Sequence, residues 1–363
     1  MNVVFIGSYN ITEVLNGPEK VSKRIFTEYT RDNKSVFIGY FSDGNRFSIL
    51  KKLFGLEEIC TVNNSVVLRS GFIKLFMLLI KIKPCIVHII NYERFALICF
   101  LYKIFSGVKI IYNVHGIVKF ENRDKKDAGL FYRLKDIICE YIFLKFSDKQ
   151  VFLSEISLKT AKEFYCTNES KVSIIPNGID REFHTQSNFR KTNYGNPLKL
   201  VFTGDIKNKW KGFESLTEAL GKISFKFELY CTGSDNYINN PADKFPFVKI
   251  INRMNTEELA QFLTDKDVFI SSSCYEQFSL AAVESMAAGL VPVVTEETGM
   301  SSFINSGFNG FRFSFSNESE LTDILNLLNA DRNRLNILSA EAVKIYEVIS
   351  WDRVFEKYRL LYQ

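Results

Sequence analysis

The sequence predicts an α/β protein of two domains, each built on a parallel sheet. Short β-branched and apolar runs alternate with helix-length amphipathic stretches along the chain, a pattern typical of strands joined by crossover helices. The length of 363 residues exceeds one ordinary core and suits two. A polar stretch closed by Gly195-Asn196-Pro197 interrupts the alternation. We therefore expect Rossmann-like domains at 1–183 and 198–347, a linker at 184–197, and a final helix at 348–363 that returns to the first domain.

The expected elements follow from these runs. Strands are predicted at 3–6, 36–40, 85–90, 109–113, 150–153 and 172–175, and then at 198–203, 225–231, 248–251, 267–271 and 291–294. Helices are predicted at 18–30, 70–82, 94–105, 128–146, 156–165, 212–222, 256–264, 279–288, 318–347 and 350–361. Open parallel sheets bind ligands beyond the carboxyl ends of their strands, so a ligand is expected in the crevice between the two domains.

Charge is distributed unevenly between the two halves. Residues 1–185 hold 27 Lys and Arg against 19 Asp and Glu, a net of +8, and the remainder holds 19 against 22, a net of −3. A basic first domain suits an anionic partner such as a phospholipid headgroup, although a scattered surplus also simply solvates a surface. The modest total of +5 and the lack of a recognition motif argue against nucleic acid as a partner.

Several features indicate a cytoplasmic protein, with the inner face of the cytoplasmic membrane as a further location. The seven cysteines are odd in number and form no C-x-x-C pair, which favours reduced thiols over disulfides or a zinc site. The first residues resemble a strand and not a signal peptide. The apolar stretch 72–82 is interrupted by Lys74 and Lys81 and is too short to span a bilayer. It is more typical of a core helix than of a helix on a membrane surface.

Two glutamates form the strongest local signal. Glu276 and Glu284 are separated by seven residues and follow a buried strand. If a helix begins near Phe278, the two lie roughly 9 to 12 Å apart, which suits the two ends of a nucleotide diphosphate-sugar. The amides of Phe278, Ser279 and Leu280 would then face the diphosphate. Alternatively, Glu276 is a helix-start charge and Glu284 a solvated helix residue, but the apolar neighbours of Glu284 disfavour that interpretation.

Other residues near predicted strand ends are weaker candidates. The strand that ends at Gly204 leads to Lys211 at a helix start, where an ammonium suits a phosphate but is equally typical of a solvated lysine. His115 follows a strand and precedes a glycine, whereas His88 and His184 are interpreted as structural. Gly17 permits close backbone approach to a ligand, but no G-x-G-x-x-G fingerprint is present.

In these motifs the sequence resembles the retaining glycosyltransferases of family 4, which have the GT-B fold. The resemblance rests on Glu276 to Glu284, Ala287-Ala288-Gly289 and Pro292-Val293, and other signals extend it over nearly the whole chain. It implies that Glu284 binds the ribose, Glu276 the donor sugar and Lys211 the diphosphate. His115 would lie beside the donor sugar and the leaving phosphate, and the loop of Gly17 near the diphosphate and acceptor. The family often has Arg after the strand glycine, whereas this chain has Asp205, so Lys207, Lys209 or the helix terminus would supply the second phosphate contact.

The resulting expectation is a retaining hexosyltransferase. It would move a sugar from a UDP- or GDP-hexose to a saccharide or lipid-linked saccharide, in bacterial surface polysaccharide assembly. His115, Glu276 and Lys211 are the expected catalytic residues, and the base and ribose are expected near Met254 and Glu284. No cofactor or metal is expected, because Asp265-Lys266-Asp267 is interpreted as a solvated turn. The alternatives are a non-catalytic nucleotide-sugar-binding protein and an epimerase of the same fold.

Overall fold

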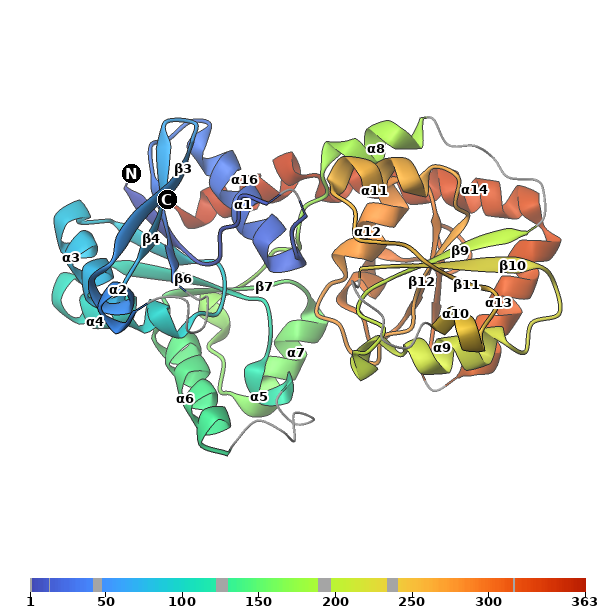
Figure 1. Cartoon of the computed structure of the whole chain (residues 1–363), viewed down its shortest axis with the longest axis horizontal. Coiled ribbons are helices and arrows are strands. Elements are labelled where there is room, and N and C mark those ends of the chain that lie inside the picture. The colour runs from blue at the N-terminus through green and yellow to red at the C-terminus, as the bar shows by residue number, and fades with distance from the viewer. Residues whose placement is uncertain are drawn as a thin grey trace. The chain divides into compact units, whose positions relative to one another are not determined.

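The computed structural model describes residues 2–12, 14–41, 48–121, 130–188, 197–233, 241–315 and 317–363, with the side chains of 130–132 left aside. The chain divides into two compact units (Figure 1). Unit 1 comprises Met1–Pro176 together with Val354–Gln363, and unit 2 comprises Asn177–Arg353. Each unit has one predominantly parallel sheet with helices packed on it, so the predicted α/β fold class is confirmed. No helix in the described ranges is long and apolar enough to cross a membrane.

Unit 1 contains an eight-stranded sheet in the order β3-β4-β2-β1-β5-β6-β7-β8. Its neighbours pair in parallel except β3 and β4, which form an antiparallel hairpin. The sequence analysis missed this hairpin, whose turn residues Asn63 and Asn64 have φ of 47° and 61°. The strands are β1 Val3–Ile6, β2 Val36–Tyr40, β3 Leu56–Val62, β4 Ser65–Ser70, β5 Ile86–Ile89, β6 Lys109–Val114, β7 Lys149–Phe152 and β8 Val172–Ile174.

Helices cover both faces of this sheet, because its strands are apolar on both sides. Val4 and Ile6 lie in one core cluster with residues of α3, α4, α6 and α7, whereas the ring of Phe5 contacts Phe26 and Tyr29 of α1 on the opposite face. The helices are α1 Gly17–Thr30, α2 Ile49–Phe54, α3 Phe72–Ile82, α4 Leu97–Ser106, α5 Val118–Glu121, α6 Leu130–Phe146, α7 Glu155–Phe164 and α16 Trp351–Leu361, with short 3₁₀ turns η1 Arg94–Ala96 and η2 Glu169–Lys171.

A buried polar cluster joins the end of the chain to the sheet of unit 1. The Nδ1 atom of His88 lies 2.8 Å from the hydroxyl of Tyr362, and its Nε2 atom lies 3.0 Å from Oδ1 of Asn113. Asn113 in turn donates to the hydroxyl of Tyr358 at 2.8 Å. All four side chains are buried. The structural interpretation of His88 is therefore confirmed, and the return of the last helix to unit 1 is explained by hydrogen bonds as well as by apolar packing.

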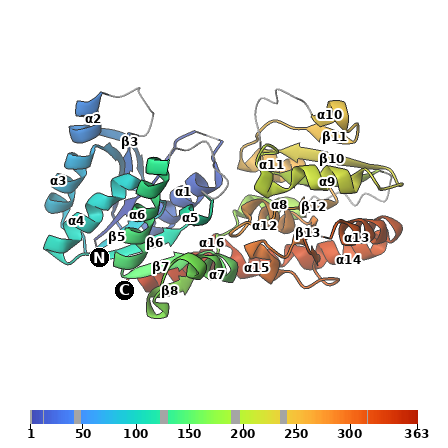
Figure 2. The same cartoon turned by 90° about the horizontal axis from the view of Figure 1, so that it is seen from below.

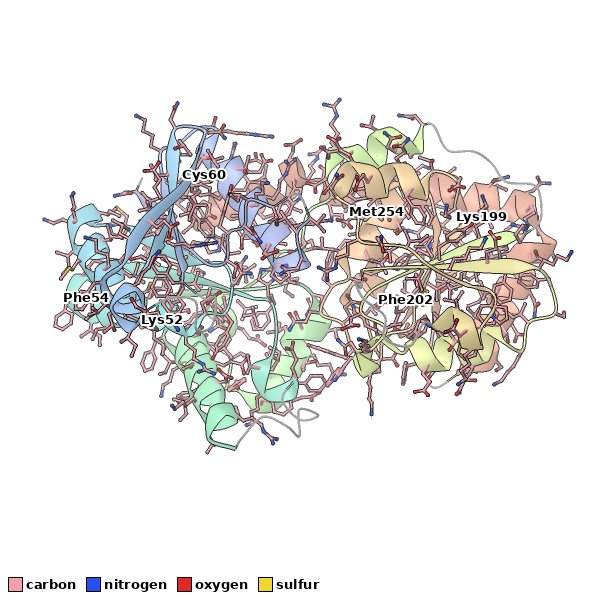
Figure 3. The ribbon with its side chains drawn as sticks, in the orientation of Figure 1. Lys52, Phe54, Cys60, Lys199, Phe202 and Met254 are labelled. Atoms are coloured by element: carbon pink, nitrogen blue, oxygen red, sulfur yellow. The ribbon has the colours of Figure 1, made fainter. Side chains whose placement is uncertain are left out.

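Unit 2 contains a six-stranded parallel sheet in the order β11-β10-β9-β12-β13-β14. Phe202 and Leu200 of β9 lie in a core cluster with Leu216 of α9 and Leu325 of α13 (Figure 3). The strands are β9 Leu198–Thr203, β10 Phe227–Thr232, β11 Val248–Ile250, β12 Val268–Ser271, β13 Val291–Thr295 and β14 Phe311–Phe313. The helices are α8 Arg181–Ser187, α9 Phe213–Leu220, α10 Pro241–Lys244, α11 Thr256–Leu263, α12 Leu280–Ala287, α13 Glu318–Ala330, α14 Arg332–Val343 and α15 Ile345–Ile349, with 3₁₀ turns η3 Lys209–Lys211 and η4 Gly299–Phe303.

The predicted linker differs from the structure. Residues 184–187 belong to α8, which packs on α11 and α12, so unit 2 begins at Asn177 and not after residue 183. Within α8 the ring of His184 stacks on Tyr346 with centroids 4.5 Å apart, which explains why this polar stretch is ordered. The remainder of the predicted linker, 189–196, lies outside the described residues.

The single helical region predicted at 318–347 is in fact three helices. Asp331 has φ of −118° and ψ of 86°, which ends α13. Its carboxylate accepts a hydrogen bond from the Arg334 amide at 2.9 Å and so begins α14. A second break at Lys344 separates α14 from α15.

The buried His88 predicts a stability that falls in acid. Burial lowers the pKa of its imidazole from 6.5 to about 4. Between these two pH values the imidazole is protonated in the unfolded chain but neutral in the folded chain. Folding stability should decline as the pH falls from 6.5 to 4, by about 3 kcal/mol from this group. Urea unfolding followed by circular dichroism across this range should show a shallower decline for His88→Gln, which is less stable than the parent at neutral pH. An equal decline in both proteins would contradict the assignment.

Candidate functional site

The turn before α9 is locked to the end of β12. Gly212 has φ of 63°, and a Cβ atom there would lie 2.0 Å from the carbonyl oxygen of Ser272. The hydroxyl of Ser272 donates to the carbonyl of Lys211 at 2.9 Å, and the amide of Cys274 donates to the carbonyl of Trp210 at 2.9 Å. β9 and β12 are parallel neighbours, so this turn lies at the carboxyl edge of the sheet. Only glycine permits such a close approach of the two backbones.

This approach brings three of the predicted site residues together. The Nζ atom of Lys211 lies 2.7 Å from Oε1 of Glu276, and both side chains remain partly exposed. The other carboxylate oxygen of Glu276 accepts from the hydroxyl of Ser273 at 3.2 Å. A Cβ atom at Gly204, which follows β9, would lie 3.4 Å from the Lys211 side chain. The site therefore holds a cation and an anion in contact, next to the backbone of Gly204.

The backbone of Glu276 is fixed on both sides. Its amide donates to the carbonyl of Glu297 at 3.2 Å, and its carbonyl accepts from the amide of Gly299 at 2.8 Å. These bonds form an isolated parallel bridge with Thr298. The carboxylate thus extends from an extended segment and not from a helix.

The helix after Glu276 begins later than the sequence analysis predicted. Ser279 has φ of 78° and ψ of 83°, a left-handed conformation that cannot continue a helix, so α12 begins at Leu280 and not near Phe278. Phe278 is buried, and its ring lies against Phe303. The first amides of the helix are consequently those of Leu280, Ala281 and Ala282. Phe278 and Ser279 precede the helix, and the expectation that their amides face a diphosphate stays a prediction.

Glu284 lies within α12 and is only 5% exposed, as its apolar neighbours indicated. Met254 is half-buried just before α11, whose first residues are capped by Asn255 (Figure 3). Next to Met254, the Nε atom of Arg253 donates to the carbonyl of Gly233 at 3.1 Å. A Cβ atom at Gly233 would lie 3.0 Å from the Gly204 amide, so Arg253 is a cation near this edge that the sequence analysis missed.

Asp205 and the Asp265-Lys266-Asp267 triplet differ in their surroundings. Asp205 is exposed, and its carboxylate accepts from the amide of Lys207 at 3.0 Å, so it shapes the turn after Gly204. Asp265-Lys266-Asp267 is not the solvated turn that was predicted, because Lys266 and Asp267 are buried. Asp265 pairs with Lys266 and with Lys199, and Asp267 accepts from the backbone amide of Lys199 at 2.8 Å. These carboxylates stabilise the start of β12, at the opposite end of the strand from Glu276.

In unit 1, His115 directly follows β6, as predicted. Its Nε2 atom is buried and has no hydrogen-bond partner among the described residues. Burial lowers the pKa of this imidazole to about 4, so it is neutral near pH 7. The next turn is held by buried Glu140, whose carboxylate accepts from the amides of Val118 at 2.6 Å and Lys119 at 3.0 Å. His115 therefore stands at the end of β6 beside a fixed turn.

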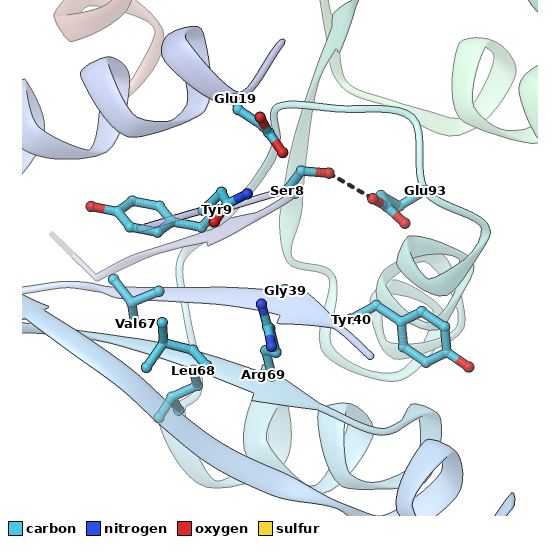
Figure 4. Close-up of a pocket in the computed structure, with 12 residues that line it drawn as sticks. Ser8, Tyr9, Glu19, Gly39, Tyr40, Val67, Leu68, Arg69 and Glu93 are labelled. Atoms are coloured by element: carbon cyan, nitrogen blue, oxygen red, sulfur yellow. Dashed lines mark hydrogen bonds between the residues drawn. The ribbon is translucent and has the colours of Figure 1, made fainter. Parts of the chain in front are cut away.

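A polar pocket of about 130 Å³ lies at the carboxyl ends of β1 and β2 in unit 1 (Figure 4). Glu19, Arg69 and Glu93 supply its charges. The hydroxyl of Ser8 donates to Glu93 at 2.8 Å, and burial raises the pKa of the Glu93 carboxyl. Gly17 begins α1 and does not line this pocket, whereas Glu19, in the capping box of the same helix, does.

The sequence analysis missed Ser8, Arg69 and Glu93. Ser8 and Glu93 follow predicted strands closely, and polar residues just after a strand are the signal that would have identified them. Arg69 belongs to β4, a strand that was not predicted at all.

The contact at Gly212 predicts a strong effect of an added methyl group. Gly212→Ala should lower the thermal denaturation midpoint of unit 2, because the left-handed backbone alone costs about 1–2 kcal/mol and the collision with Ser272 adds to it. Gly221→Ala is the matched control, since its backbone is right-handed and a Cβ there meets atoms only at 3.4 Å or beyond. Equal midpoints for the two variants would contradict this account of the turn.

Comparison with known proteins identifies the family. Residues 58–183 match the family described as Glycosyltransferase Family 4, and residues 184–344 match the family described as Glycosyl transferases group 1. The chain is 24% identical to an α-1,3-galactosyltransferase of Escherichia coli that acts on UDP-Gal and α-D-GlcNAc-diphosphoundecaprenol, over 92% of this chain and 90% of that protein. It is also 24% identical to an uncharacterized glycosyltransferase of Methanocaldococcus jannaschii, over 63% of this chain and 64% of that protein.

Solved structures agree on the fold. The HepE protein of Anabaena in complex with UDP-glucose superposes with a TM-score of 0.74 at 15% identity, covering 99% of each chain. With both halves matched in order and the fold shared over the full length, the chain belongs to the family 4 glycosyltransferases and has the GT-B fold.

Proposed function

We propose that this protein transfers a hexose from a UDP- or GDP-hexose to a saccharide or lipid-linked saccharide acceptor, with retention of anomeric configuration and without a divalent cation. The observation that carries the proposal is the pair formed by Lys211 and Glu276 at the carboxyl edge of the unit 2 sheet, 2.7 Å apart. The two charges hold one another in place and remain partly exposed, and Glu276 lies a few residues before Leu280, the first residue of α12.

This arrangement suits a donor whose leaving group is a diphosphate. An ammonium has three N–H donors, so Lys211 can bind Glu276 and a phosphate oxygen at once. The first amides of α12 and the positive end of its dipole supply further attraction for an anion. As the bond between the sugar C1 and the phosphate oxygen breaks, charge grows on the phosphate. Fixed donors there stabilise the transition state more than the ground state.

The remaining predicted residues complete the proposed donor site. Glu276 would bind hydroxyls of the donor sugar, and buried Glu284 the ribose, with the base near Met254. The acceptor hydroxyl forms its bond to C1 on the face that the phosphate leaves, and its proton passes to a phosphate oxygen. His115, whose imidazole is neutral near pH 7, is retained as the third proposed catalytic residue.

The acceptor is assigned to the polar pocket of unit 1. Its two carboxylates and one guanidinium are groups that bind sugar hydroxyls through paired hydrogen bonds. The name of the Escherichia coli relative specifies a sugar linked through diphosphate to undecaprenol as its acceptor. We extend that acceptor class, and a role in surface polysaccharide assembly, to this protein.

Transfer assays test the donor site. With UDP- and GDP-hexoses, Glu276→Gln and Lys211→Ala should each lower kcat by about 10²–10³-fold, the usual loss when a group aimed at developing charge is removed. Lys222→Ala is the control, because its exposed ammonium pairs with Glu318 elsewhere in unit 2. EDTA should leave the rate unchanged, and the product of an α-linked donor should have the α configuration by NMR.

The competing functions give distinct results in the same assays. Binding of nucleotide diphosphates in a thermal-shift screen without transfer from any donor would indicate a non-catalytic binding protein. Product formed without acceptor would indicate an epimerase. A β-configured product, or a rate lost with EDTA and restored by Mg²⁺, would overturn the corresponding part of the proposal.

A second assay tests the acceptor pocket. Glu93→Gln should raise the KM for the acceptor sugar about tenfold while the KM for the donor sugar stays constant. The substitution replaces a carboxylate by a neutral amide, which forms weaker hydrogen bonds with sugar hydroxyls. Glu163→Gln, an exposed change on α7, serves as the control. A rise in donor KM, or no change in either constant, would show that the acceptor binds elsewhere.

A further inference from the structure

The outward sides of α3, α4 and α6 in unit 1 expose large apolar side chains in unusual density. Ile104 is 77% exposed, Phe105 74% and Met77 52%. On each helix the exposed residues recur at helical spacing and so form a stripe: Ile73, Met77 and Ile80 on α3; Leu101, Ile104 and Phe105 on α4; Leu134, Ile138, Tyr141 and Phe146 on α6. Most of the strongly exposed large apolar residues in the described ranges lie here or on neighbouring α2.

These stripes form one continuous surface. The buried sides of α3, α4 and α6 share one core cluster on the same face of the sheet, so their outer sides point the same way. α3 packs on α4, and α4 packs on α6. The rings of Phe76 on α3 and Phe105 on α4 meet edge to face, 6.4 Å apart. α2, whose Phe54 is half-exposed, packs beside α3 (Figures 1 to 3). We call this surface the lysine–apolar face.

The exposed charges that these four helices themselves carry are positive, although Lys51 pairs with Glu57 of neighbouring β3. The sequences of α2, α3 and α4 contain lysines and no Asp or Glu. Asp136 and Glu140, the two acids of α6, are buried, whereas its Lys135 and Lys145 are exposed. Lys103 pairs with Asp148 just beyond α6. The lysines of the four helices are Lys51, Lys52, Lys74, Lys81, Lys103, Lys135 and Lys145.

The combination of apolar stripes and lysines distinguishes between two partners that could cover this face, a second copy of the chain and a lipid bilayer. A second copy of the chain docked by two-fold symmetry would place lysines against lysines, with no exposed acid on these helices to neutralise them. An anionic bilayer offers both complements: acyl chains and glycerol groups for the apolar stripes, and phosphates for the lysines. Helices with these properties bind in the plane of the interface and do not span it.

We propose that the lysine–apolar face docks unit 1 onto an anionic phospholipid bilayer. The stripes of α3, α4 and α6 enter the headgroup region, and lysines such as Lys74 and Lys81 contact lipid phosphates. The proposal does not rest on the proposed reaction, since it uses no residue of the donor site or the acceptor pocket.

Vesicle flotation with the full chain tests the proposal. Vesicles of phosphatidylcholine with phosphatidylglycerol should bind the protein, and vesicles of phosphatidylcholine alone should bind it at least about tenfold more weakly. The pair Ile104→Ser and Phe105→Ser, and separately the pair Lys74→Glu and Lys81→Glu, should each weaken binding to the anionic vesicles at least about tenfold. These side chains are exposed or at the surface, so circular dichroism should show both variants folded.

Ile337→Ser with Val348→Ser is the matched control, because both residues are exposed apolar residues of unit 2. It should bind vesicles like the parent, and all variants should retain transfer to a soluble acceptor. Failure of the parent to bind anionic vesicles, or equal binding by all variants, would overturn the proposal. It would also fail if sedimentation velocity showed a dimer that the Ile104→Ser and Phe105→Ser pair converts to a monomer, since the face would then contact a second copy.

Discussion

The candidate donor site depends on how closely the turn at Gly212 approaches the end of β12. A side chain at this position would overlap the carbonyl of Ser272. Because glycine leaves this space empty, the two backbones lie close together, and the hydroxyl of Ser272 donates to the carbonyl of Lys211. Because the turn cannot move away from the strand, the ammonium of Lys211 reaches Glu276, which is itself fixed by Glu297 and Gly299. Two rigid backbone segments thus define the distance between one cation and one anion.

The backbone conformation also determines where the site groups lie at the start of α12. Ser279 takes a left-handed conformation, which is costly for a residue with a side chain and is common at functional sites. It turns the chain sharply from the extended segment of Glu276 into the helix. The helix amides therefore follow the carboxylate closely, and of the three predicted amides only that of Leu280 belongs to the helix.

Much of this architecture could be predicted from the sequence. The runs at Val3–Ile6, Val36–Tyr40 and Leu198–Thr203 gave the strands with their bounds, because buried parallel strands are continuous apolar runs. The β3–β4 hairpin was missed because its strands are half-exposed and mixed in polarity, and the Asn63-Asn64 turn that marks it was not recognised. Glu276 was singled out by motif spacing and Lys211 by the family resemblance, and the structure brings the two side chains together. Arg69 was missed because it belongs to β4, a strand that the sequence pattern did not reveal. The helix start at 278 was wrong because spacing carries no information on the conformation of Ser279.

The cluster of His88, Asn113, Tyr358 and Tyr362 also has a consequence for protein synthesis. Two of its members are made early and two late, and His88 and Tyr362 are 274 positions apart in the sequence. While the ribosome translates unit 2, the polar groups of His88 and Asn113 lack their tyrosine partners, and the face of the first sheet that α16 covers stays open. Unit 2 needs no such distant segment, because it consists of one continuous stretch of chain. The later half of the molecule can therefore complete its core before the earlier half does, reversing the usual order in which domains mature as they emerge.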